Sequence, residues 1–231
     1  MDGARRWAEI GWPSIRFAGY IGVSLLIGMI AREYVRALVA AKLGDPTPRL
    51  WGRLTWNPRA WFEPFGSGLL PALVLVLWAA ASGLYPPPAA YGKPAPVDPM
   101  YLRRSTRDQV FVGFAGPVAN VVLAAIAGIA IRIAAPSMGA EVFLLLVAFE
   151  FTQLSLAIFH LLPIPGLDGA RIVALMLPPR PAEVYRNADQ YLPLIILVVL
   201  FIFAGPVNSI VYSLVDGLCR AFSGFGCRPL V

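Results

Sequence analysis

The amino-acid sequence predicts an all-α polytopic membrane protein, from its composition, its long apolar stretches and the polar loops between them. Of its 231 residues, 58% are hydrophobic and 14% are charged. Soluble domains contain about 50% apolar and about 25% charged residues, so this composition argues against a water-soluble enzyme. The high apolar content also excludes a disordered chain, and two cysteines are too few for a disulfide-bonded scaffold.

Five stretches are apolar and long enough, or nearly so, to cross the hydrocarbon core, which takes about 20 residues. They lie at residues 17–43, 67–85, 109–134, 141–162 and 192–218. The first connection contains LWGRLTW at residues 50–56, which is typical of a short β-hairpin. We therefore expect a helical bundle of five or six membrane segments, with a short β-hairpin after the first helix.

The two ends of the chain are expected to lie outside this bundle. Residues 1–16 are too polar for the core of a signal peptide, and Trp7, Trp12 and three arginines fit a segment at the membrane interface. We predict an interfacial tail at residues 1–16, a membrane domain at residues 17–219 and a C-terminal tail at residues 220–231.

The formal net charge of +6 does not indicate a nucleic-acid partner, because the basic residues are scattered between apolar stretches and form no patch. In a membrane protein such an excess usually marks cytoplasmic loops that face anionic lipid. We expect membrane lipids to be among its partners, and no nucleic acid.

The first apolar stretch carries three charged residues at membrane depth: Arg32, Glu33 and Arg36. Helical periodicity places Arg32 and Arg36 on one face, one turn apart. An unpaired arginine at this depth costs at least about 3 kcal/mol on insertion scales. Each arginine therefore either extends to the nearby end of the helix or pairs with anionic groups inside the bundle.

A conventional zinc site is excluded by the supply of ligands. His160 is the single histidine of the chain, and Cys219 and Cys227 lie near its C-terminal end. Sites with three or four histidine and cysteine ligands cannot be assembled from these residues. A lone histidine in an apolar helix is more often a hydrogen-bonded packing residue than a ligand.

Five blocks, in order along the chain, resemble motifs of the site-2 protease family of intramembrane zinc metalloproteases in its compact bacterial form. The first block begins with REYVR at residues 32–36, similar to the family's HExxH motif, and continues through a Gly-Asp turn to GRLTWNP at 52–58. The others are WFEPFGS at 61–67, YGKPAPVDP at 91–99, FAGPVAN at 114–120 and LLPIPGLDG at 161–169. The resemblance implies a site-2-protease-like bundle in a bacterial inner membrane.

The departures from these motifs imply a lost chemistry. In HExxH the two histidines bind zinc and the glutamate activates the bound water. Here Arg32 and Arg36 hold both histidine positions, and a protonated guanidinium has no lone pair for a metal. Glu33 is retained at the general-base position and Asp168 at that of the third ligand. We expect these four residues to be vestiges of an active site, with no catalytic residue, no metal and no cofactor.

The family fold would bring Asp168 beside Arg32 and Arg36. We hypothesise a structural ion-pair cluster of these three residues, joined by Glu33 or Glu63, in which two guanidiniums replace the positive charge of zinc. The alternative is that both arginines face a water-filled cavity. An Asp168 more than one water molecule away from both guanidiniums would reject the cluster.

If residues 32–36 and 168 meet, residues 67–108 must leave and return on one side of the membrane. Both termini would then be external. In that oxidising compartment a disulfide between Cys219 and Cys227 is feasible, the alternative being two unpaired cysteines.

These expectations favour a pseudoprotease: a catalytically inactive membrane protein that acts as a binding, scaffold or regulatory subunit for another transmembrane protein or complex. One alternative is a residual intramembrane metallopeptidase that uses Glu33 and Asp168. Another is a small-solute or ion transporter, lined by Arg32, Arg36, Glu33 and Glu150.

Overall fold

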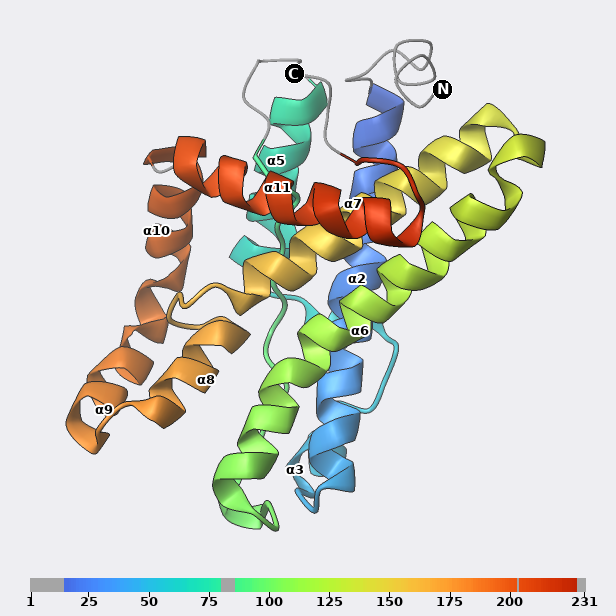
Figure 1. Cartoon of the computed structure of the whole chain (residues 1–231). Helices are drawn as coiled ribbons and strands as arrows, with labels where there is room; N and C mark the ends of the chain where they lie inside the picture. The colour runs from blue at the N-terminus through green and yellow to red at the C-terminus, as the bar shows by residue number, and fades with distance from the viewer. Residues whose placement is uncertain (1–14, 80–85, 203, 228–231) are drawn as a thin grey trace.

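The computed structural model describes residues 15–79, 86–202 and 204–227, and in these ranges every regular element is a helix. Three long helices, α2 (Ile15–Lys42), α6 (Ser105–Ala134) and α7 (Ala140–Leu161), pack against one another at the centre of the molecule (Figure 1). The all-α prediction is therefore confirmed.

Shorter elements surround these three helices. Between α2 and α6 lie α3 (Thr47–Leu50), α4 (Pro58–Trp61), the π-helical turn η1 (Pro64–Leu69), α5 (Leu70–Ala79) and η2 (Pro99–Tyr101). The turn η3 (Ala135–Ser137) joins α6 to α7. After α7 come α8 (Asp168–Met176), α9 (Pro179–Asn187), η4 (Ala188–Tyr191), α10 (Leu192–Leu197), η5 (Val198–Ile202) and α11 (Ala204–Phe222).

Two helices of the described chain have the length and apolar composition needed to cross a membrane, where the sequence predicted five or six segments. They span Thr106–Ser137 and Ala140–Leu161. Helix α2 has 28 residues but carries the charges of Arg32, Glu33 and Arg36. Residues 192–202, in α10 and η5, are fewer than the roughly 20 that a span requires.

The β-hairpin predicted at residues 50–56 is not formed, and the described residues contain no strand. Leu50 instead ends the short helix α3, and residues 51–56 form turns and irregular chain. Helix α3 is preceded by Pro46 and contains Pro48 in its first turn. Prolines favour the first turn of a helix and cannot donate to a β-ladder. Asp45 accepts a hydrogen bond from the Thr47 backbone N at 2.9 Å, and Gly52, with φ at 64°, turns the chain after the helix.

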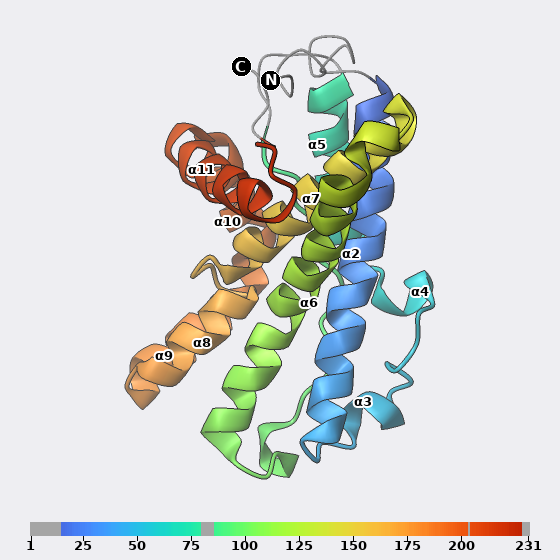
Figure 2. The same cartoon turned by 45° about the vertical axis from the view of Figure 1, so that its right-hand side comes forward.

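The stretch 192–218, predicted as one span, is divided. Helix α11 lies across the bundle, at a steep angle to α10 (Figures 1 and 2). Its first turn contains Pro206, which lacks the N–H that a continuous helix would need there. Val211 and Val215 on one face of α11 are buried, whereas Ile210 and Leu214 on the other are exposed.

Residues 86–92 form irregular chain in the interior, and all of them are buried. Helix α5 runs toward the end of the molecule where α2 begins, and the chain after it returns toward the end where α6 begins (Figure 1). Irregular backbone at membrane depth is tolerated when protein covers it. The return path brings this chain close to the middle of α2.

The two predicted tails meet the structure only in part. Residues 1–14 and 228–231 lie outside the described residues, and α2 begins at Ile15. At the other end, the predicted domain boundary after residue 219 falls inside α11. Cys227 is joined by a disulfide to Cys219, with 5.8 Å between the two Cα atoms.

Candidate functional site

The charged residues of α2 lie at the centre of the bundle, where α6 and α8 approach α2. The side chains of Arg32, Glu33 and Arg36 are 2–3% exposed. Asp168, the first residue of α8, is 1% exposed. Burial of isolated charges is very unfavourable, so these groups require partners within the protein.

The Asp168 carboxylate contacts both guanidiniums. Arg32 donates from one terminal nitrogen to Asp168 Oδ2, and Arg36 Nη1 lies 3.1 Å from Asp168 Oδ1. Glu33 is the second shared acceptor: its Oε1 lies 2.5 Å from Arg32 Nη1 and its Oε2 3.8 Å from Arg36 Nη1. Two cations and two anions therefore face one another, and their formal charges cancel.

Neighbouring backbone fixes this arrangement from two sides. The backbone N of Ala95, on the returning chain, donates to Glu33 Oε2 at 3.1 Å. On α6, a Cβ added at Gly116 would lie 3.3 Å from Asp168 Oδ2 and 3.4 Å from Arg32 Nη2. The glycine of FAGPVAN therefore allows α6 to approach the charged groups closely.

Glu63 has its contacts elsewhere. Its carboxylate caps η1 by accepting a hydrogen bond from the backbone N of Gly66, and its own backbone N donates to Ser67 Oγ at 3.1 Å. Nearby, Trp61 is fully buried, and its indole N donates to the Thr55 carbonyl at 2.9 Å. The structure thus joins Arg32, Glu33, Arg36 and Asp168, and it does not add Glu63 to them.

A cavity of about 170 Å³ borders Arg32, Glu33 and Arg36, and residues that the sequence did not single out for this position line it as well: His160, Arg171 and Asp189. A second cavity, of about 370 Å³, shares Arg36, Arg171 and Asp189 with the first. Burial raises the pKa of the Asp189 carboxyl, against the opposing effect of its hydrogen bond from Gly166. Arg171 could have been anticipated, because it follows Asp168 by three positions on one helix.

The donor set at these positions does not fit zinc. Both carboxylates already accept guanidinium groups, and the arginines cannot coordinate. His160 Nδ1 lies 2.9 Å from the Leu156 carbonyl, and its Nε2 has no hydrogen-bond partner. Nevertheless, His160, Glu33 and Asp168 do not form a three-donor group of metal-binding size in the described chain.

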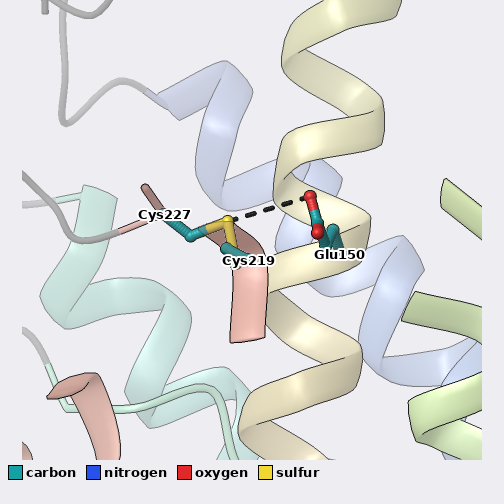
Figure 3. Close-up of side chains that lie close together, drawn as sticks. All are labelled: Glu150, Cys219 and Cys227. Atoms are coloured by element: carbon teal, nitrogen blue, oxygen red, sulfur yellow. Dashed lines mark hydrogen bonds between the residues drawn. A yellow bond between two sulfur atoms is a disulfide. The ribbon is translucent and has the colours of Figure 1, made fainter. Parts of the chain in front are cut away.

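One such group does occur among the described residues, at Glu150, Cys219 and Cys227 (Figure 3). Its sulfur atoms are bonded to each other and therefore offer no thiolate to a metal. Cys227 Sγ lies 3.9 Å from Glu150 Oε2. A disulfide sulfur carries no hydrogen, so this is a packing contact and the group is not a metal site in this state.

Comparison with known proteins gives the family. The chain is 32% identical over 203 residues to "Putative zinc metalloprotease YwhC" of Bacillus subtilis, which covers 83% of this chain and 83% of that protein. The chain belongs to the site-2 protease family. It is also 30% identical over 225 residues to "Putative zinc metalloprotease Rip2" of Mycobacterium tuberculosis, covering 94% of this chain and 82% of that protein. The Rip2 of Mycolicibacterium smegmatis is 31% identical over 208 residues, 86% of this chain and 74% of that protein.

No family model matches the chain, and no solved structure matches it. Membership in the site-2 protease family therefore depends on these relatives. Together with the apolar helices, it identifies the chain as a site-2-protease-like membrane protein.

Proposed function

We propose that this protein is a non-catalytic member of the site-2 protease family, which binds another transmembrane protein as a scaffold or regulatory subunit. The observation that carries the proposal is the pairing of Arg32 and Arg36 with Asp168 and Glu33. Two guanidiniums at the histidine positions supply the positive charge that a dication would otherwise bring, and they leave both carboxylates occupied.

The cluster has a structural role in this proposal. A buried carboxylate without a counter-charge is strongly unfavourable, and removing one partner of a buried pair typically costs about 3–5 kcal/mol. Asp168 holds the N-terminus of α8 against α2, and Glu33 holds the returning chain through Ala95. The arginines therefore support the packing of three segments on one centre without any metal.

The protein's location is part of the same proposal. We propose a multi-pass protein of the bacterial cell membrane, because the relatives are bacterial proteins and the apolar helices are long. The exposed apolar side chains on α6, such as Ile126 and Ile133, suit contact with lipid or with a partner helix. We propose that the partner is a transmembrane protein and that the chain binds no nucleic acid.

A residual metallopeptidase is the second candidate, favoured by the names of the relatives and by the retained Glu33 and Asp168. It would require a metal to displace at least one guanidinium from these carboxylates. A transporter would require continuous hydration of the path beside Arg36, whereas the four charged residues are almost fully buried.

Metal content and proteolysis test the proposal. The purified protein is expected to contain far less than one zinc per chain. YwhC, a relative named as a putative zinc metalloprotease, is purified and assayed in parallel as the control. Purification in mild detergent is expected to recover a transmembrane protein in a fixed ratio to the chain. One zinc per chain that is lost in Asp168→Ala, together with cleavage of a transmembrane substrate, would overturn the proposal.

A further inference from the structure

An apolar groove of about 600 Å³ lies between α2 and α6. All of its lining residues are apolar. One wall is the face of α2 that carries Val35, Val39 and Leu43, and the other includes Val118 and Val122 of α6. The two helices diverge toward the end where α2 finishes, as both views show (Figures 1 and 2).

The α6 wall is open to the surroundings. Val118 is 54% exposed and Val122 51% exposed. A contiguous apolar surface of this kind marks a site of interaction with a ligand, a protein or a membrane. A groove of this volume lies within the roughly 300–1,000 Å³ typical of ligand pockets.

Three basic residues adjoin or contact lining residues at the end of the groove where the helices diverge. Lys42 directly precedes the lining residue Leu43 and is exposed. The backbone N of Arg103 donates to the Leu43 carbonyl at 3.4 Å. The Arg107 guanidinium lies over the ring of Phe111, another lining residue, at 5.2 Å from its centroid.

The described acidic residues near this end form no ion pair with these cations. Asp45 is buried and accepts hydrogen bonds from the backbone N of Thr47 and Asp98, at 2.9 and 2.8 Å. Asp108 is also buried and accepts from the Arg104 backbone N at 2.8 Å. In the described chain, the ion pairs include none with Lys42, Arg103 or Arg107.

We propose that this groove binds an anionic phospholipid. An acyl chain packs along Val35, Val39 and Val118, and the headgroup phosphate is bound by Arg103 and Arg107, with Lys42 nearby. A guanidinium binds phosphate oxygens in a bidentate manner, and charge complementarity selects an anionic headgroup over a zwitterionic one. The proposal stands independently of the catalytic state of the protein.

Native mass spectrometry of the full chain, titrated with dioleoyl phosphatidylglycerol or dioleoyl phosphatidylcholine, tests this site. We expect one phosphatidylglycerol to be retained with at least about tenfold preference, since each basic residue near an anionic headgroup contributes roughly a fivefold gain. Ala119→Trp and Val122→Trp fill the groove and should abolish retention. Leu214→Trp, at an exposed apolar position of α11 outside the lining, is the control and should retain the lipid.

The headgroup contact has its own variants. Arg103→Ala/Arg107→Ala should remove the preference for phosphatidylglycerol, while Arg180→Ala, an exposed basic residue of α9, should preserve it. Unchanged retention in both groove-filling variants would overturn the proposal. Equal retention of the two lipids would also overturn it, because the groove would then select no headgroup. The proposal would also be overturned if a transmembrane helix co-purified with the protein and Ala119→Trp displaced that helix without changing lipid retention.

Discussion

Arg32 and Asp168, 136 positions apart in the sequence, form a buried ion pair between the middle of α2 and the first residue of α8. Both side chains are at most 2% exposed, so the pair is shielded from water and salt. Arg36 contacts the other oxygen of the same carboxylate. One aspartate is thus the anion for two guanidiniums, and it joins the middle of α2 to the start of α8.

Asp168→Ala is expected to lower the free energy of unfolding by about 3–5 kcal/mol, because it leaves two buried guanidiniums with Glu33 alone. Glu141→Ala is the control. It removes the surface pair with Arg16, whose side chains are 73% and 61% exposed, and should cost about 0–1 kcal/mol. Denaturation in detergent, followed by circular dichroism, measures both variants. Equal, small losses would show that Asp168 does not stabilise the bundle through ion pairs.

Removing all four charges together should be far less harmful than removing one. The variant Arg32→Met/Glu33→Gln/Arg36→Met/Asp168→Leu leaves no buried charge unpaired, and apolar replacement of a buried ion cluster is often neutral or stabilising. We expect its unfolding free energy to lie within about 2 kcal/mol of the unsubstituted protein. The same denaturation experiment, run beside Asp168→Ala, measures this non-additivity. A fourfold variant as unstable as the single one would contradict the cluster as the source of the effect.

Arg32→His/Arg36→His is expected to create a zinc site. Histidines at i and i+4 share one helix face, and Asp168 already lies against that face, which gives three ligands and an open fourth position. Elemental analysis should find about one zinc per chain. The control is Arg32→Gln/Arg36→Gln, which removes the same positive charges without adding a nitrogen ligand and should bind none. Failure of the histidine variant to bind zinc would mean that α2 and α8 are not positioned as they are in a metal-binding relative.

Gly116→Ala should destabilise the protein by about 1–3 kcal/mol, since its Cβ would press on Asp168 Oδ2 and Arg32 Nη2 in a packed, charged environment. Gly19→Ala in α2 is a matched control. A Cβ there meets nothing within 4 Å, and alanine improves helix propensity by up to about 1 kcal/mol. A thermal denaturation series of both variants separates close packing from propensity. The reverse order of stabilities would show that α6 does not approach the cluster at Gly116.

The sequence anticipated the cluster's centre better than its surroundings. The spacing of Arg32 and Arg36 requires one helix face, and the cost of burying them requires an anion, so a partner for them could be expected without coordinates. Of the two glutamates that the hypothesis offered, Glu33 joins the cluster, whereas Glu63 caps η1 by bonding to Gly66, a local role that depends on a π-helical turn that no periodicity signals. The contribution of Ala95 is a backbone N–H, and backbone donors carry no sequence signature.

The errors in the fold have physical causes of the same kind. Apolar content alone predicted one span at residues 192–218, but Pro206 interrupts the helix there, whereas Pro117 lies inside α6 without ending it. The prolines at 46 and 48 favour a short helix directly before the predicted hairpin, and that helix takes up its first residue, Leu50.

The disulfide between Cys219 and Cys227 closes a short loop, with a sequence separation of 8, against the end of α11. Chain-entropy arguments give such a loop about 2–3 kcal/mol of stabilisation. Cys219→Ser/Cys227→Ser is therefore expected to lower the melting temperature, with Ser213→Ala, an exposed position of α11, as the control.

Because both cysteines are at most 3% exposed, reductant should reach them only after unfolding. Mass spectrometry after alkylation should thus show no labels on the folded protein, even with reductant, and two labels on the unfolded, reduced chain. Labelling of the unfolded protein without reductant would show that the cysteines are free thiols and that the loop is held by packing alone.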